Sequence, residues 1–476
     1  MRTFIMRNHI HLTVFLGVLI LAFTACEISS TNENPNQATS TGLNNLLPHA
    51  QANLAYGLGG NISQYNSVLM QQMAGTERVH GDVSRYNFSS GIAGTVWDQN
   101  LYSGAMNNLY LVIQRAEEEE AWHHRGVAKI LMANALGMVT SLWNHVPYTE
   151  AFQGADFPTP AYDNSQEVIY PEIQRLLTAG VEDLRRSVGL MQQLGNEDLI
   201  YGGNLAMWEM AANALSARYH NHSSKVDPQG SATAVLNALG RGTLTSNTDN
   251  MSFPFSTEEQ QANPWYTHNV SAFGTNTAMG EFFVDLLLSI DDPRLPHFAA
   301  PNSDGDFVGQ IAGVLGREGI SELGEYYNRP EGPFHYITFS EVKFLEAEAN
   351  YRLGNYGPAA EAMNEAIIAS LEEVTGEADA AYVAAQASET AASIQDGDGL
   401  TRLMTHKYVA LFLQQEVFSD WRRTGIPALQ PAEQNLTGNV IPRRWPYPQS
   451  EINANRTNVD AAGPASLTDR VWWDVP

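Results

Sequence analysis

Cysteine and lysine are the residues that this sequence has least of. Cys26 is the only cysteine among 476 residues, so no disulfide can form within the chain and packing alone must hold the fold. Lysine occurs only as Lys129, Lys225, Lys343 and Lys407, and the formal net charge is -26. This balance excludes nucleic acid as a partner, because binding phosphates requires a basic stripe. It also excludes charge-driven binding to anionic lipid.

Long apolar runs are equally scarce, and the one that stands out covers residues 12–23. Arg2 and Arg7 precede it and the small residues Thr24 and Ala25 follow, which is the order of a secretory signal peptide. The run is too short to cross a bilayer, which takes about 20 residues. We therefore predict a signal peptide over residues 1–25, and no membrane span after it.

Cys26 stands where a bacterial lipoprotein is cleaved and lipidated, and the residues before it resemble a lipobox. Phe23 departs from that motif, which usually has leucine three residues before the cysteine. The alternative is an ordinary signal peptide followed by a chance cysteine. We predict lipidation at Cys26 and a lipidated tether over residues 26–48, which are rich in Ser, Thr, Asn and Pro. Residues 49–476 then form the folded domain.

Helical periodicity dominates that domain, and alternating strand patterns are rare, so the fold class is mainly α. The apolar spacing predicts helices over residues 97–120, 124–142, 167–188, 205–222, 233–239, 276–290, 339–353, 358–371 and 399–418. Small and aromatic residues on the segments around Gly354 and Gly357 resemble a tetratricopeptide helix pair. One pair leaves an apolar face open, so the earlier helices are expected to stack beside it.

Four segments between the helices are long and rich in Pro, Gly, Asn and aromatic residues: 144–163, 242–274, 291–337 and 421–476. Loops of this length in a compact protein carry function or pack as ordered excursions. The aromatic C-terminal segment is too apolar for a disordered tail, so we expect it to wrap around the body. Aromatic side chains beside these loops suit stacking on sugar rings, or holding peptide side chains, or simple packing.

Signatures of catalysis and of metal binding are missing from the sequence. It contains no G-x-S-x-G elbow, Walker A loop, G-x-G-x-x-G after a strand or H-E-x-x-H helix. The segment with Asn302, Asp304 and Asp306 starts like a calcium loop but lacks the late glutamate, so we interpret it as a turn. We therefore expect no enzyme activity, no cofactor and no metal site.

An ordered set of motifs follows Cys26 through almost the whole chain. It comprises residues 32–36, 141–152, 198–203 before Trp208, 263–266, 292–295, 421–425, 441–444, 447–448, Glu451, Asn455 and 471–473. Together these motifs resemble the SusD/RagB nutrient-binding outer-membrane lipoproteins of Bacteroidetes, in particular the SusD-like branch. No single motif is specific, but their order is.

The resemblance implies a body of tetratricopeptide-like helix pairs joined to a loop-rich irregular half. It implies a lipid anchor on the outer membrane, facing the cell exterior, and a SusC-like TonB-dependent transporter as the partner over which the lipoprotein sits as a lid. Family sites use aromatic and polar loop residues. The nearest matches, and thus the candidate ligand-binding residues, are Arg78, Asp82, Tyr86, Trp97, Trp265 and Tyr326.

The sequence therefore predicts a non-catalytic surface lipoprotein that captures an oligosaccharide, or a peptide, and delivers it to the transporter. Two alternatives remain open. A surface hydrolase of the same polymers would release products, and a ligand-free helical-repeat scaffold would bury the aromatic loop residues in its packing.

Overall fold

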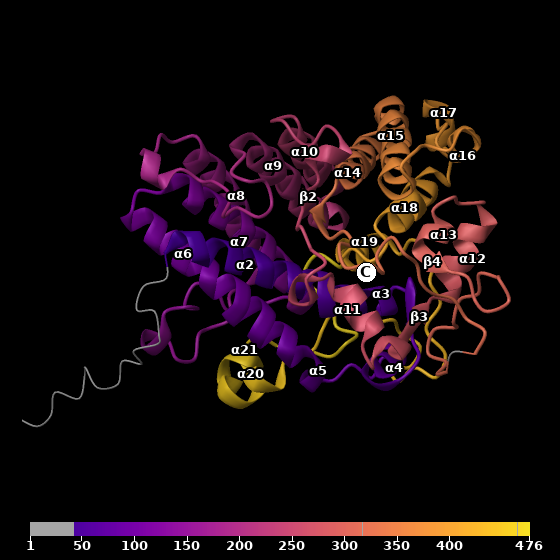
Figure 1. Ribbon diagram of the computed structural model, residues 1–476, viewed down its shortest axis with the longest axis horizontal. Helices are drawn as coiled ribbons and strands as arrows, with labels where there is room; N and C mark the ends of the chain where they lie inside the picture. The colour runs from indigo at the N-terminus through magenta and orange to yellow at the C-terminus, as the bar shows by residue number, and fades with distance from the viewer. Residues whose placement is uncertain (1–41, 317, 464) are drawn as a thin grey trace, which may run out of the picture. The chain divides into compact units, whose positions relative to one another are not determined.

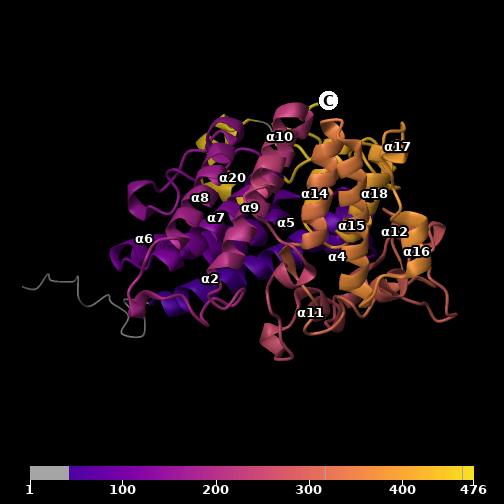
Figure 2. The ribbon, with the colours of Figure 1, turned by 90° about the horizontal axis from the view of Figure 1, so that it is seen from above.

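Long α-helices stand side by side through most of the molecule (Figures 1 and 2). The computed structural model describes residues 42–316, 318–463 and 465–476, and Leu43–Pro476 forms one compact unit. The strands are only two or three residues long, so the predicted mainly α class is confirmed. The predicted signal peptide, Cys26 and most of the tether lie outside the described residues.

The first half of the chain contains most of the stacked helices. They are α2 (Leu43–Gly57), α3 (Ser63–Leu69), α4 (Arg78–Ser84), α5 (Ser90–Thr95), α6 (Asn107–Glu118), α7 (Trp122–Trp143), α8 (Tyr170–Leu184), α9 (Leu205–His222) and α10 (Pro228–Leu239), with π-helical stretches η1 (Leu58–Ile62), η2 (Val96–Met106) and η4 (Ser165–Ile169).

The second half mixes long helices with short helices and loops. The helices are α11 (Pro264–Val270), α12 (Glu281–Ser289), α13 (Leu295–Phe298), α14 (Phe339–Arg352), α15 (Tyr356–Thr375), α16 (Ala380–Gln386), α17 (Ala391–Ile394), α18 (Gly399–Ala410), α19 (Glu416–Thr424), α20 (Gln449–Ala454) and α21 (Arg456–Ala461). Antiparallel strand pairs join β1 (Met73–Gly75) to β3 (Thr277–Met279), β2 (Met251–Ser252) to β6 (His335–Ile337), and β4 (Ala299–Ala300) to β5 (Glu322–Leu323).

The helix pairs follow one another as the repeat pattern predicts. Seen from above, α7 and α8, α9 and α10, and α14 and α15 form a row that continues to α18 (Figure 2). The turn between α14 and α15 contains Gly354 at φ +76°, a conformation that glycine adopts without strain. Buried alanines, including Ala347, Ala359 and Ala366, let the two helices approach closely. The other half of the unit is loop-rich, as expected.

Helix α7 is the central core helix. By length and composition Trp122–Trp143 could cross a membrane, contrary to the prediction that no segment after the N-terminus would. However, 94% of its most apolar window is buried inside the protein, so its hydrophobicity is satisfied by packing against its neighbours. The helix serves as the core of the first helix pairs.

Several predicted boundaries differ from those of the structure, and three of the differences have a local reason. The helix predicted over 276–290 begins only at Glu281, because Thr277–Met279 pairs with β1 instead. The helix predicted over 399–418 stops at Ala410, where Gln72 and Ser63 bond to the backbone of Leu413 and replace the helical partners. The end of the tether at residue 48 falls inside α2, whose Leu43 and Leu47 are buried.

The C-terminal segment wraps around the first half of the chain, as expected from its aromatic content. Trp143 donates its indole N–H to the carbonyl of Pro446 at 2.8 Å, and Trp445 donates its backbone N–H to Leu142 at 2.8 Å. Further along, Trp473 donates its indole N–H to the Tyr170 hydroxyl at 2.6 Å. Helix α20 lies beside α5 (Figure 1), so this segment also reaches the start of η2.

Candidate functional site

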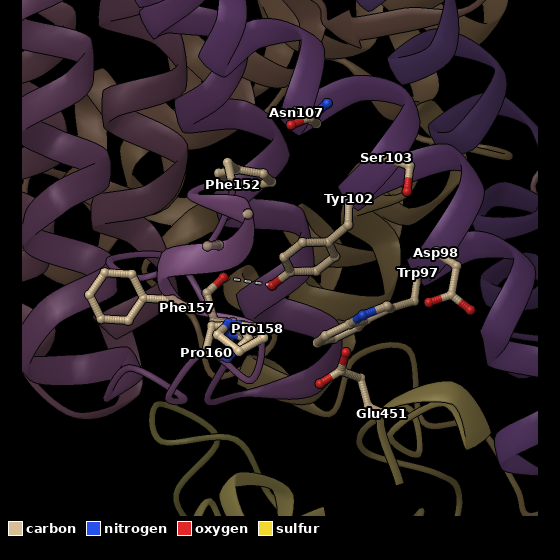
Figure 3. A pocket seen from close by; sticks show the side chains of 13 residues that line it. Trp97, Asp98, Tyr102, Ser103, Asn107, Phe152, Phe157, Pro158, Pro160 and Glu451 are labelled. Carbon is tan, nitrogen blue, oxygen red and sulfur yellow. Dashed lines mark hydrogen bonds between the residues drawn. The ribbon is translucent and has the colours of Figure 1, made fainter. Parts of the chain in front are cut away.

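A cavity of about 470 Å³ opens where three parts of the chain meet. Stretch η2 supplies Trp97, Asp98 and Tyr102, the loop after α7 supplies residues 147–160, and α20 supplies Glu451 (Figure 3). The wide turns of π-helix often mark functional positions. The cavity is therefore the strongest candidate for a ligand site in the described part of the chain.

One wall of the cavity is a row of nearly parallel aromatic rings. Trp97 and Tyr102 stack with centroids 4.6 Å apart and planes at 29°, and Phe152 continues the row 6.0 Å from Tyr102 at 27°. On the other side of the indole, Tyr162 lies 6.3 Å away at 19°. Phe157 stands at the rim and is 39% exposed. The rings of the row face one another, so the exposed Phe157 ring is the one that can stack on the apolar face of a sugar.

Hydrogen bonds hold the wall in place. The Tyr102 hydroxyl donates to the carbonyl of Pro147 at 2.8 Å (Figure 3), and the Tyr162 hydroxyl donates to Glu451 Oε2 at 2.8 Å. Burial first, and the Glu451 charge second, raise the pKa of both tyrosines well above 10. Both therefore stay neutral donors at physiological pH.

The loop over the cavity is fixed rather than free. Asp163 accepts the backbone N–H groups of Tyr148 and Thr149 at 2.8 Å each, and also the Thr149 hydroxyl at 2.7 Å. From the C-terminal segment, the amides of Asn455 and Asn458 donate to the carbonyls of Pro160 and Thr159. The cavity is thus largely formed before any ligand arrives.

The structure disperses the six candidate residues predicted from sequence. Trp97 alone lines this cavity. Arg78 and Asp82 lie on α4, where Arg78 is exposed above the Phe273 ring and Asp82 pairs with Arg85 at 3.0 Å. Tyr86 follows α4 but is only 2% exposed, and its hydroxyl accepts the backbone N–H of Ala432.

Trp265 and Tyr326 lie in the core. Trp265 is 2% exposed and donates its indole N–H to the Ser63 hydroxyl at 2.8 Å. Tyr326 is 8% exposed, packs edge-on against Tyr327, and donates its hydroxyl to Glu373 at 3.3 Å. Long-range packing covers both rings. The burial expected of the scaffold alternative therefore holds for these two, and also for Tyr86 and Trp97, which are each 2% exposed, but not for Phe157 at the rim of the cavity.

Several lining residues were not among the sequence candidates: Asp98, Tyr102, Phe152, Phe157 and Glu451. Two signals could have found some of them. Tyr102 follows Trp97 by five residues on the same helical stretch, and Phe152 and Glu451 stand in motifs that carried the family resemblance. Their meeting at one cavity depends on how the C-terminal segment wraps, which no local pattern reveals.

A second cavity, of about 600 Å³, lies against α12 and is lined by Glu281, Asp285 and Glu433. Burial and repulsion from the other two carboxylates raise the pKa of Glu281. Among the described residues, no group of three or more His, Cys, Asp and Glu side chains is placed to hold a metal ion. The Asn302 side chain accepts the backbone N–H groups of Asp304 and Asp306, so that segment is a turn, as interpreted from sequence.

Comparisons with known proteins agree with this architecture. Residues 35–448 match the SusD-like family described as starch-binding and associating with the outer membrane. No curated protein matches the chain. Among solved structures, a chitin-binding protein is 25% identical with a TM-score of 0.79, and the match covers 91% of this chain and 100% of that one.

Two further structures show the same fold. A chitin-binding SusD homolog from Flavobacterium johnsoniae is 23% identical with a TM-score of 0.76, covering 91% of this chain and 97% of that one. A SusD/RagB family protein from Bacteroides thetaiotaomicron is 21% identical with a TM-score of 0.76, covering 91% and 99%. The family resemblance seen in the sequence is therefore confirmed.

Proposed function

We propose that this chain, which belongs to the SusD-like family of starch-binding proteins that associate with the outer membrane, captures oligosaccharides at the cell surface and delivers them to a SusC-like TonB-dependent transporter. Capture takes place in the cavity of η2, the loop after α7 and α20. No catalytic step is involved. The observation that carries the proposal is the row of stacked rings along one wall of a preformed cavity.

The choice of glycan over peptide is supported by two kinds of observation. The family is described as starch-binding, and two structures similar to this chain are named as chitin-binding. The cavity itself offers the exposed Phe157 ring at its rim and the edges of Tyr102 and Phe152, beside the hydrogen-bonding side chains of Ser103 and Asn107. Rings stack on the apolar faces of a sugar while the polar groups bond its hydroxyls.

Removing a ring at the rim tests this placement. Phe157→Ala and Phe152→Ala are each expected to weaken oligosaccharide binding roughly tenfold, the equivalent of about 1.4 kcal/mol, because stacking area is lost. Titration calorimetry with maltooligosaccharides and chitooligosaccharides measures this. The matched control is Phe273→Ala, which removes a ring that is 51% exposed outside the cavity.

Other outcomes of the same titrations identify the alternatives. Unchanged affinity in both rim variants would exclude this cavity as the site. Binding of peptides without binding of glycans would favour the peptide alternative, and shorter products in the mixture would favour a hydrolase. Failure of every ligand to bind would favour the scaffold.

Anchoring at the membrane through lipid on Cys26 is the second part of the proposal. Cys26→Ser is expected to release a folded protein with unchanged glycan affinity, because the thiol that accepts lipid is removed. Fractionation of cells into membrane and soluble parts measures this, with Glu27→Gln as the neighbouring control. A serine variant that stayed in the membrane fraction would contradict lipidation at this residue.

A further inference from the structure

Two carboxylates flank the aromatic wall of the proposed glycan cavity. Asp98 comes from η2 and Glu451 from α20, and both lie beside the Trp97 indole (Figure 3). The Ser450 hydroxyl donates to Asp98 Oδ1 at 3.0 Å, and Ser450 immediately precedes Glu451. This bond keeps the two acidic side chains at the same side of the cavity, although 353 positions separate them in the sequence.

Each carboxylate uses only one of its oxygens within the described part of the chain. Glu451 Oε2 accepts the Tyr162 hydroxyl at 2.8 Å and the Asn455 amide at 3.2 Å, and Asp98 Oδ1 accepts the Ser450 hydroxyl. Neither Glu451 Oε1 nor Asp98 Oδ2 has a protein hydrogen-bond donor there. Each of these two oxygens has free lone pairs, so each can accept a hydrogen bond from a ligand.

Within the described part of the chain, no lysine, arginine or histidine is paired with these two carboxylates. The described lining of the cavity includes no lysine, arginine or histidine, and neither acidic residue forms a salt bridge with another described residue. The formal charge of -26 adds a negative potential around the site. A ligand that brings its own positive charge therefore meets an attractive field, whereas an anionic ligand meets repulsion.

The strength of the bonds that the two carboxylates can form adds to this preference. A charged hydrogen bond from an ammonium group to a carboxylate is stronger than a neutral one. Trp97 and Tyr102 lie beside Asp98 and Glu451, but stacked neighbours cover the faces of both rings, so the preference rests on the carboxylates.

We propose that this cavity selects glycans that carry a free amino group, such as oligomers of glucosamine, over neutral glycans, and that it rejects glycans built from uronic acids. The inference rests on the proposed glycan-binding function and names the ligand class of that same cavity. Stacking of sugar rings supplies affinity common to all three classes, and Asp98 and Glu451 supply the discrimination among them.

The test compares three oligomers of equal length by titration calorimetry: glucosamine, N-acetylglucosamine and galacturonic acid. The pH is chosen so that the amine is protonated while the melting temperature shows the protein to be folded. We expect the glucosamine oligomer to bind about tenfold more tightly than the acetylated one at low salt. A tenfold difference corresponds to a charge interaction of about 1.4 kcal/mol. The difference should shrink as salt rises, and the galacturonate oligomer should not bind measurably.

Charge-neutral variants assign the effect to the two residues. Asp98→Asn and Glu451→Gln are each expected to weaken binding of the glucosamine oligomer several-fold more than binding of the acetylated oligomer. The controls Glu281→Gln and Glu433→Gln make the same change of net charge at the second cavity and should alter neither affinity. Equal weakening of both oligomers by Asp98→Asn and Glu451→Gln would overturn the assignment.

The possible outcomes distinguish a failure of the charge selection from a failure of the proposed glycan binding. Equal affinity for the aminated and acetylated oligomers, or binding of galacturonate, would overturn the charge selection and leave glycan capture standing. Absence of binding by all three oligomers, and by maltooligosaccharides, would overturn both.

Discussion

Glu348→Ala is expected to destabilise the protein by about 3–5 kcal/mol, the usual cost of breaking a buried ion pair on one side. Glu348 lies on α14 with none of its surface exposed, and it joins that helix to α19 and α9. Arg423 donates to its two oxygens at 2.7 and 2.9 Å, Arg352 donates at 2.7 Å, and Asn221 donates at 2.9 Å.

Removing this carboxylate leaves a buried cation without its main partner. Burial alone would raise the pKa of Glu348, but the Arg423 and Arg352 charges lower it well below the usual value, so the group is ionised at neutral pH. In Glu348→Ala, the buried Arg423 would retain only Asp420 on its own helix as a charged partner. The desolvation cost of the guanidinium then remains without its compensation.

Urea denaturation followed by circular dichroism measures the free energy of unfolding. The control is Glu346→Ala, two residues away on α14, whose partly exposed pair with Lys343 is worth about 1 kcal/mol or less. Glu348→Gln keeps the volume and removes the charge, and should fall between the two. If Glu348→Ala and Glu346→Ala lowered the free energy of unfolding equally, the buried ion pair would contribute no more to stability than the partly exposed one.

On acidification, the protein is expected to unfold at a pH well above the range in which its carboxylates become protonated. Burial is the largest cause that lowers the pKa of four histidines from 6.5, to about 3 for His80 and to about 4 for His220, His268 and His406. For His80, the neighbouring His268, with ring centroids 4.8 Å apart, adds to the effect. All four are therefore neutral in the folded protein at pH 7.

Stability falls as the pH falls, because the unfolded chain binds protons that the folded protein does not. Because the folded pKa values are depressed, the neutral histidines keep their full contribution to stability above pH 6.5. As the pH falls below 6.5 the unfolded chain takes up protons that the folded protein cannot, until the folded values near 4 are reached. Each histidine then removes about 1.4 kcal/mol of stability per pH unit, so four together can exhaust a typical stability by about pH 5.

Urea denaturation at pH 7.5, 6.5, 6.0 and 5.5 measures the slope of stability against pH. In His406→Gln, unfolding takes up about one proton fewer, so the slope should fall by about 1.4 kcal/mol per pH unit. This holds whatever the substitution does to the free energy of unfolding at pH 7.5. His49→Gln, at an exposed position, serves as the control for the substitution itself. A constant stability from pH 7.5 to 5.5 would contradict the neutral, buried state of these side chains.

Local patterns in the sequence predict the helices well and the site poorly. Helix α9 has the bounds that apolar periodicity predicts, because periodicity records which face of a helix is buried. Trp97 and Trp265 look alike in sequence, since each stands beside a loop with polar neighbours. Their exposed fractions do not distinguish them either, because both side chains are 2% exposed. The difference lies in the tertiary structure: the Trp265 indole bonds to Ser63 in the core, while Trp97 lies in the wall of a cavity.

The breaks in the helices illustrate the same limit. The stretch after Ala410 has a helical pattern, yet Leu413 adopts φ +60° because Gln72, far away in the chain, accepts its N–H. Glu451 belongs to the cavity only because the C-terminal segment wraps back to α5. Such pairings depend on tertiary structure, which a local pattern does not contain.

The wrapping of the C-terminal segment also determines when the protein can finish folding. Trp143 bonds to Pro446 and Tyr170 bonds to Trp473, and each pair is 303 positions apart in the chain. Contacts between such distant positions slow folding, because a long loop must close before they form. Until the final segment docks, the helices around Trp143 keep an apolar surface uncovered. Chains that have not yet closed this loop are thus exposed to aggregation, and a chaperone has its longest opportunity to bind at that stage.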